Sequence, residues 1–323
     1  MIERAFDVPF VAALAQREKQ IQQSYRPVIG VHKWFARRPG SLFRSLLLAE
    51  FANGASLASN FFRSHNLNSL VVGDPFMGGG TPLLEANRLG AHVVGTDINP
   101  MAYWVVRQEL GKLDRVAFRA AAEQVIAAVE ADVGRFYQTT CTSCHNAASV
   151  KYFLWVKLQH CTACQQLFSL FSTYLLSKNE RHPTYVLVCP GCGSLHEVAS
   201  LQEVEGKSCG TCTTILSVKG PAQRNVCPCP HCAYPNRYPD TEAGVPQHRL
   251  FAIEYHCSTC KPTHKGRFFK VPDAADQQQV LDATRRLAES EPRWVPREAV
   301  PPGDESDRLH RWGYEYYHQL FNP

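Results

Sequence analysis

The stretch that decides the fold is Leu70-Val71-Val72-Gly73-Asp74-Pro75-Phe76-Met77-Gly78-Gly79-Gly80-Thr81. Its first residues predict a short buried strand that ends at Asp74. The glycines that follow permit positive φ angles and let a ligand approach the backbone closely. We expect Thr81 to cap a helix whose first residue is Pro82.

A second strand and helix follow directly. His92–Thr96 predicts a strand that ends at Asp97, and Asn99 before Pro100 predicts another helix cap. The order strand, loop, helix, strand, helix is the opening of a doubly wound α/β sheet. Such sheets bind ligands at the carboxyl ends of their strands, where a helix N-terminus favours negative charge and an acid such as Asp97 accepts hydrogen bonds from ribose hydroxyls.

Two common nucleotide motifs do not fit this loop. Gly78 and Gly80 match the first two places of a dinucleotide fingerprint, but Leu83 occupies the third, which argues against NAD and FAD. The loop is not a P-loop either, because its last glycine, Gly80, is followed by Thr81-Pro82 rather than by Lys and then Ser or Thr. The structural alternative is a tight turn that binds nothing.

Several segments resemble those of a known family. DPFMGGGT (74–81) followed by VVGTDINP (93–100) resembles the S-adenosylmethionine-binding segments of DNA amino-methyltransferases, whose signature is Asp-Pro-Phe-x-Gly-x-Gly-Thr. HKWFARRP (32–39) and a later cysteine-rich insert resemble the subgroup of zinc-ribbon-containing DNA methylases, generally treated as adenine-specific. The resemblance implies an α/β fold: an incomplete Rossmann-like methyltransferase sheet with an inserted zinc-ribbon region.

The resemblance also implies roles for individual residues. Asp74 and the backbone of 76–80 would hold the methionine part of S-adenosylmethionine, and Asp97 would bind its ribose. Segment 32–39 occupies the place of a cofactor-contacting segment, although its arginines suit DNA phosphates or a solvated helix start equally. The expected cofactor-binding residues are His32, Lys33, Asp74, Pro75, Phe76, Gly78, Gly79, Gly80, Thr81, Asp97 and Asn99. The expected DNA-binding residues are Arg37, Arg38 and Arg44.

The catalytic loop of that family is missing. The loop reads Asp, Asn or Ser, then Pro-Pro, then Tyr or Phe; it accepts the hydrogens of the exocyclic amine and stacks on a flipped base. Here the only Pro-Pro pair is Pro301-Pro302, which lies between Val300 and Gly303. We therefore expect the N-terminal part of a methyltransferase, either a fragment or one half of a split enzyme whose second polypeptide carries the catalytic half.

The 13 cysteines all lie between Cys141 and Cys260, and twelve of them form six CxxC pairs. Paired CxxC turns are typical of four-thiolate zinc sites, so we expect about three Zn²⁺ ions. Redox catalysis is the rival interpretation. Cys227 is left over as a free thiol. The expected metal ligands are Cys141, Cys144, Cys161, Cys164, Cys189, Cys192, Cys209, Cys212, Cys229, Cys232, Cys257 and Cys260.

The spacing of the six pairs leaves their partnership open. Taken in chain order, partners are separated by 16, 16 and 24 residues. Alternatively, Cys161/Cys164 pairs with Cys189/Cys192 across a hairpin over 167–188. The sites are either purely structural or carry basic hairpins for DNA or a partner; the candidate basic residues are Lys261, Lys265, Arg267 and Lys270.

Composition and charge exclude several classes of protein. The chain of 323 residues is 45% apolar and 20% charged, which favours a folded protein of about two domains. Residues 141–272 carry 13 Lys and Arg against 7 Asp and Glu, a surplus that three zinc sites of charge −2 would cancel. No window approaches the length of a membrane span, and no secretory signal is recognisable, so we expect a cytoplasmic protein.

We expect three regions along the chain. Residues 1–136 form the N-terminal segment and first half of the cofactor domain, 137–272 the zinc-ribbon insert, and 273–323 a helix, a proline-rich linker and the start of the catalytic half. Helices are predicted over 7–22, 41–51, 100–136 and 273–290. The function is either S-adenosylmethionine-dependent methylation of duplex DNA, N6-adenine by resemblance, or a non-enzymatic zinc-ribbon adaptor that binds nucleic acid or protein and keeps a vestigial cofactor fold.

Overall fold

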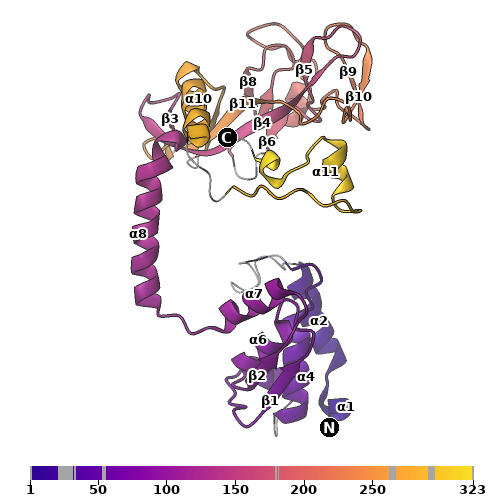
Figure 1. Cartoon of the computed structure of the whole chain (residues 1–323), viewed down its shortest axis with the longest axis vertical. Helices are drawn as coiled ribbons and strands as arrows, with labels where there is room; N and C mark the ends of the chain where they lie inside the picture. Colours follow the sequence, from indigo (N-terminus) through magenta and orange to yellow (C-terminus); the bar gives the residue numbers. More distant parts are fainter. Residues whose placement is uncertain are drawn as a thin grey trace. The chain divides into compact units, whose positions relative to one another are not determined.

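The computed structural model describes residues 2–20, 32, 34–52, 56–178, 180, 182–261, 267–289 and 295–321. The chain divides into two compact units, 1–121 and 122–323, and the long helix α8 (Arg115–Val133) spans the division (Figure 1). The fold is mixed α/β with small antiparallel sheets. No helix among the described residues is long and apolar enough to cross a membrane.

Unit 1 is built around two parallel strands. Strands β1 (Val71–Asp74) and β2 (His92–Gly95) pair in register, with Val72 opposite Val93. Helix α6 (Thr81–Arg88) connects them, and both central valines pack against a core of leucines and alanines. A complete doubly wound sheet is not shown, because this two-stranded sheet is the only parallel pairing in the described residues.

The helices of unit 1 include those predicted over 7–22 and 41–51, whose ends lie within two residues of the prediction. They are α1 (Ile2–Ala5), α2 (Val8–Gln20), α4 (Gly40–Phe51), α5 (Leu57–Phe61), α6 and α7 (Pro100–Leu110). The expected helix over 100–136 is broken at Gly111, where α7 ends and α8 begins four residues later. Buried Glu18 on α2 accepts hydrogen bonds from the backbone N–H groups of Gly40 and Ser41, so it satisfies two otherwise orphaned donors of α4.

One helix cap differs from expectation. Asn99 caps α7 as predicted, since its side chain accepts a hydrogen bond from Met101 N. Thr81, by contrast, is the first residue of α6 rather than its cap. Gly80 takes the cap position in a left-handed conformation (φ 69°), which a glycine adopts without steric cost.

Unit 2 is organised by one long strand. Strand β4 (Ala147–His160) pairs with β3 (Gln138–Thr140), β5 (Leu167–Ser169) and β11 (His248–His256), and β11 pairs with β12 (Phe268–Lys270). Two smaller antiparallel sheets complete the unit: β6 (Leu175–Ser177), β7 (Tyr185–Val188) and β8 (Leu195–Val198), and β9 (Val226–Pro228) with β10 (Pro235–Arg237). The short helical segments are η1 (Gly134–Tyr137), η2 (Leu201–Val204), α11 (Asp307–Arg311) and η3 (Tyr317–Leu320).

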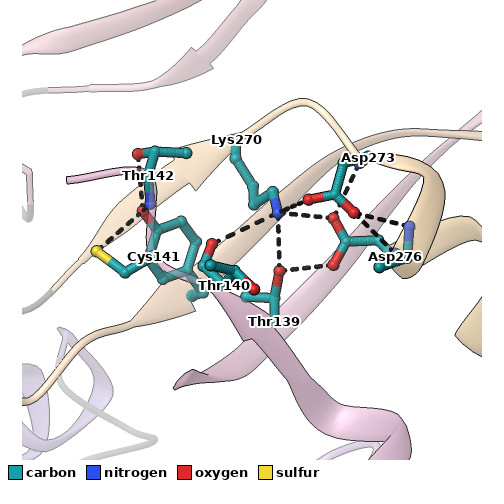
Figure 2. Close-up of polar contacts among 9 residues, drawn as sticks. Thr139, Thr140, Cys141, Thr142, Lys270, Asp273 and Asp276 are labelled. Carbon is teal, nitrogen blue, oxygen red and sulfur yellow. Dashed lines mark hydrogen bonds and ion pairs between the residues drawn. The ribbon is translucent and has the colours of Figure 1, made fainter. Parts of the chain in front are cut away.

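Helix α10 (Ala274–Glu289) is fastened to the main sheet by a buried ionic cluster (Figure 2). Lys270 Nζ lies 2.6 Å from Asp273 Oδ2, 2.8 Å from Asp276 Oδ2 and 3.0 Å from Thr139 Oγ1. Asp273 and Asp276 also bond each other's backbone N–H groups, which caps the helix. The cluster therefore ties the start of α10 to strands β12 and β3.

Candidate functional site

The twelve paired cysteines form three four-sulfur clusters in unit 2. Facing sulfur atoms are 3.5–4.0 Å apart, for example 3.6 Å between Cys144 and Cys257 and 3.7 Å between Cys164 and Cys229. A tetrahedron of sulfurs about 2.3 Å from a zinc ion has edges of about 3.8 Å. These distances suit a shared metal ion and are much too long for disulfide bonds, so the clusters are consistent with three Zn²⁺ ions.

The clusters are nested in the chain rather than consecutive. The outer one joins Cys141/Cys144 to Cys257/Cys260, the next joins Cys161/Cys164 to Cys229/Cys232, and the inner one joins Cys189/Cys192 to Cys209/Cys212. Only the inner pairing matches the chain-order prediction. The alternative pairing of Cys161/Cys164 with Cys189/Cys192 does not occur. The reason is that β4 pairs antiparallel with β11, so chain segments far apart in sequence bring their cysteine turns together.

The five cysteine turns that lie wholly within the described residues share one backbone conformation. In each, the first cysteine N–H bonds the carbonyl five residues later, and the residue after the second cysteine returns its N–H to the first cysteine. That residue has a left-handed φ of 60–76° in every case: His145, Gln165, Gly193, Thr213 and Ala233. Only Gly193 adopts this region without steric cost.

A buried polar side chain supports the outer cluster and another supports the second cluster. Tyr255 Oη lies 3.0 Å from the N–H of Thr142, which donates to it, and 3.7 Å from Cys141 Sγ. Asn236 does the same in the second cluster: its Oδ1 accepts from Thr162 N at 2.8 Å, and its Nδ2 donates to Cys161 Sγ. Such donors spread the negative charge of a thiolate and fix its position. Neither residue is predictable from the CxxC pattern, because both lie outside the CxxC turns.

The inner cluster is supported by its own turns. Ser194 Oγ and His196 Nε2 lie 3.3 and 3.2 Å from Cys209 Sγ. The hydrogen bond from Ser194 lowers the pKa of Cys209 to about 4. Cys209 is therefore poised as a thiolate, the form that binds metal. All four ligand positions of each cluster are cysteines.

Cys227 remains outside the clusters, as expected. Its side chain is fully buried, and burial raises the pKa of this thiol to about 11. A protonated buried thiol is a poor ligand and a poor nucleophile. All 13 cysteines are described, and none forms a disulfide.

In unit 1, the glycine loop lies between the carboxyl ends of β1 and β2. Asp97 Oδ2 accepts a hydrogen bond from Gly78 N and its Oδ1 accepts one from Asn99 N, both at 2.8 Å. These backbone donors lower the pKa of Asp97, so the carboxylate is ionised at neutral pH. Asp74 Oδ1 accepts from Phe76 N at 3.1 Å. The loop therefore presents two acids held by backbone donors.

Two exposed apolar residues flank these acids. Phe76 is 85% exposed and Ile98 is 99% exposed. Pro75 accepts a hydrogen bond through its carbonyl from Thr96 Oγ1, which ties the loop to the residue before Asp97. An exposed phenyl and an exposed isoleucine beside paired carboxylates are suited to a ligand with an apolar ring and hydroxyl groups.

Segment 34–39 covers one side of the loop through Trp34. A Cβ added at Gly79 would lie 2.8 Å from Trp34 Cγ, and one at Gly78 would lie 3.1 Å from Trp34 Nε1. The indole is thus in contact with the glycine backbone, which explains why side chains are absent there. The expected contact residue Lys33 lies outside the described residues.

His32, Arg37 and Glu109 form a cluster of titratable side chains near Trp34, and the sequence did not indicate this cluster. His32 Nδ1 is 3.3 Å from Glu109 Oε1, and Arg37 Nη2 is 2.9 Å from His32 Nε2 and 3.9 Å from Glu109 Oε1. Burial raises the pKa of Glu109 to about 7. His32 thus contacts Glu109 and Arg37, and no signal in the sequence pointed to Glu109.

The DNA-binding candidates separate into buried and exposed residues. The Arg37 side chain is 3% exposed, and Arg44 is 12% exposed with its guanidinium donating to the carbonyls of Phe61 and Arg63. Of the three arginines, only Arg38 is exposed. Among the hairpin candidates, Lys270 is buried in the cluster of Figure 2 and Arg267 donates to Glu254, whereas Lys261 is exposed and Lys265 lies outside the described residues.

Comparisons with known proteins do not assign a family. No protein-family model, curated protein or solved structure matches this chain.

Proposed function

We propose that this chain is the cofactor-binding and zinc-ribbon part of an S-adenosylmethionine-dependent DNA amino-methyltransferase. The single observation that carries the proposal is the arrangement of Asp97, whose carboxylate is held at 2.8 Å by Gly78 N across the mouth of the glycine loop. The acid keeps free lone pairs for the ribose hydroxyls of a nucleoside. S-Adenosylmethionine, when bound, supplies the methyl group on a positively charged sulfur.

The loop residues fit the shape and polarity of that cofactor. Exposed Phe76 and Ile98 offer apolar surface for the adenine ring, and Asp74 offers a second carboxylate near the loop backbone. Gly78 and Gly80 adopt positive φ, so the loop turns sharply away from the strand ends. Asn99, engaged as the cap of α7, positions Asp97 through its backbone N–H.

The acceptor half of the proposed enzyme is not recognisable in this sequence. No acid or amide precedes Pro301-Pro302 and no aromatic residue follows them. We propose that a second polypeptide supplies the groups that hold the acceptor amine, and that duplex DNA is the substrate. The zinc clusters serve as the scaffold of unit 2.

Cofactor binding by the full chain tests the proposal. Equilibrium dialysis with labelled S-adenosylmethionine should show binding that Asp97→Asn weakens ten- to a hundredfold, since hydrogen bonds to a charged acceptor contribute about 1.5–3 kcal/mol. Asp114→Asn is the matched control, because Asp114 caps α8 through Val116 N in the same unit. Equal affinity of wild type and Asp97→Asn would refute the assignment of the loop.

The second candidate is a non-enzymatic zinc-ribbon adaptor with a vestigial cofactor fold. It is favoured by one observation: the three cysteine clusters are fully assembled within unit 2 without any residue of the glycine loop. An adaptor binds no S-adenosylmethionine and transfers no labelled methyl group to duplex DNA, with or without a second polypeptide. Cofactor affinity therefore separates the two candidates.

A further inference from the structure

Unit 2 contains an aromatic cleft that none of the zinc clusters uses. It has a volume of about 380 Å³ and lies between η1, strand β4 and helix α10. Phe136, Tyr137, Phe153 and Trp155 form one side, and Val280 and Leu287 of α10 form the other. The volume lies within the roughly 300–1,000 Å³ of small-molecule sites, and the walls suit a flat aromatic ring.

One polar atom in this cleft lacks a partner. Gln279 Oε1 is buried and has no hydrogen-bond partner in the part of the chain that the structure describes. A buried amide oxygen without a donor is costly, so nearly all such atoms are satisfied by protein, water or ligand. A planar ligand that donates an N–H group would both fit between these walls and satisfy Gln279 Oε1.

A second hollow adjoins the cleft and is lined by three arginines, Arg135, Arg285 and Arg286, and by two acids, Asp282 and Glu289. It has a volume of about 450 Å³ and shares Phe136, Gln279 and Arg286 with the cleft. Arg285 and Arg286 have acidic partners, Asp282 and Asp132. Arg135 stacks its guanidinium 4.6 Å from the Phe136 ring, and no acid pairs with it in the described chain. The unpaired cation is available to a phosphate.

The wall formed by α10 is held in place. The cluster of Lys270, Asp273 and Asp276 fixes the start of α10 three residues before Gln279 (Figure 2). Further along, Arg286 pairs with Asp132 across the cleft, so both ends of the α10 wall are anchored. The cleft is therefore formed before any ligand arrives, which lowers the entropic cost of binding.

We propose that this cleft binds one unpaired base of a nucleic acid. The base stacks on Trp155 and its neighbours, a ring or exocyclic N–H donates to Gln279 Oε1, and the adjoining phosphate meets Arg135. Each part matches what single-strand binding proteins use: aromatic stacking that tolerates any base, with a cation for the backbone. The proposal does not rest on cofactor binding, because no residue of unit 1 enters it.

The test compares two fluorescein-labelled DNA probes by anisotropy, without S-adenosylmethionine. One is a duplex with a single unpaired adenine, and the other is the fully paired duplex of the same length. We expect the full chain to bind the probe with the unpaired base on the order of tenfold more tightly, the scale of one base stacked on an aromatic side chain. The same two probes made in RNA show which nucleic acid is preferred.

Variants assign the preference to the cleft. Trp155→Leu and Gln279→Leu should abolish it, and the second keeps the test valid if the first disturbs the sheet. Arg135→Gln should weaken binding of the probe with the unpaired base and reduce its salt dependence by about one phosphate contact, while leaving the affinity for the fully paired probe unchanged. Trp104→Leu is the matched control, since Trp104 lies exposed on α7 in unit 1. Zinc content verifies that unit 2 is folded in each variant.

Two results would overturn the proposal. Equal affinity of the wild type for both probes excludes an unpaired base as the ligand. A preference that survives both Trp155→Leu and Gln279→Leu places the base elsewhere on the chain. Because the assay contains no cofactor, these outcomes are independent of the dialysis result for Asp97→Asn.

Discussion

At the scale of single residues, the residue after each of these cysteine pairs has a left-handed backbone conformation, and its side chain sets the conformational cost of the turn. Gly193 has a φ of 76°, and an added Cβ there would have no neighbour within 4 Å. The cost of a side chain at this position is therefore purely conformational. Ala233 occupies the equivalent place in another turn with a φ of 62° and bears a methyl group at the same cost.

Reciprocal substitutions at these two positions should have opposite effects. We expect Gly193→Ala to lower the free energy of unfolding of unit 2 by about 1 kcal/mol and Ala233→Gly to raise it by about as much, since left-handed backbone costs L-residues roughly 1–2 kcal/mol. Urea denaturation of the zinc-loaded chain measures both. Stability changes of the same sign in the two variants would refute the shared turn geometry.

Glu109 should make unit 1 sensitive to pH. Burial raises its pKa to about 7, above the ordinary carboxyl value of 4.5, so the folded state binds the proton more tightly than the unfolded state. The contribution of protonated Glu109 to the free energy of unfolding of unit 1 is present in full below pH 4.5 and is lost as pH rises through 7. The neighbouring His32, whose pKa burial lowers, acts in the opposite direction, while Arg37 stays charged.

The difference between wild type and Glu109→Gln isolates this effect. Between pH 5 and pH 8, the wild type should lose stability relative to the variant, because only the wild type must ionise a buried carboxyl. Hydrogen exchange of α7 amides in the full chain, at several urea concentrations, reports on unit 1 alone. Parallel pH profiles for the two proteins would show that Glu109 is not protonated in the folded state.

At the scale of secondary-structure elements, local signals were predictive and long-range pairing was not. Caps and apolar periodicity correctly indicated α2, α4, α7 and α10, because these signals act within a few residues. The partnership of the CxxC pairs depends on the pairing of β4 with β11, which lie almost a hundred residues apart in the chain. The spacing of the CxxC pairs carries no sign of that strand pairing and so favoured partners adjacent in the chain. The contact of Trp34 with Gly78 and Gly79 and the hydrogen bond from Asn236 to Cys161 were not predicted for the same reason.

The attachment of α10 is an element-scale prediction. Lys270→Met leaves Asp276, which is 3% exposed, without its cation, and breaking a buried ion pair costs about 3–5 kcal/mol. Thermal unfolding of unit 2 should show this loss. Lys151→Met is the control: Lys151 lies 3.9 Å from Glu254 and is 46% exposed, so its loss should cost less than about 1 kcal/mol. Comparable effects of the two variants would mean that the cluster in Figure 2 does not anchor the helix.

At the scale of the whole molecule, the two units depend on different forces. Unit 1 has a core of packed aliphatic and aromatic side chains that includes Leu48, Phe61 and Leu89. Unit 2 instead has three small cores, and cysteines of the clusters are members of each one. Sulfur ligands thus replace much of the apolar packing that short strands cannot supply, as in other small metal-dependent domains.

Metal removal should therefore unfold unit 2 and spare unit 1. A structural zinc site contributes about 10–16 kcal/mol to folding in zinc-finger peptides, so no strand pairing of unit 2 is expected to survive the loss of three ions. After thorough chelation, hydrogen exchange should lose protection in β4, β7 and β11 while α4 and α6 keep theirs, and elemental analysis of the untreated chain should give three zinc ions. Retained protection in β4 and β11 after complete zinc loss would show that the cysteine clusters do not hold the unit together. Protection lost equally in α4 would show that unit 1 folds only with its zinc-bound neighbour.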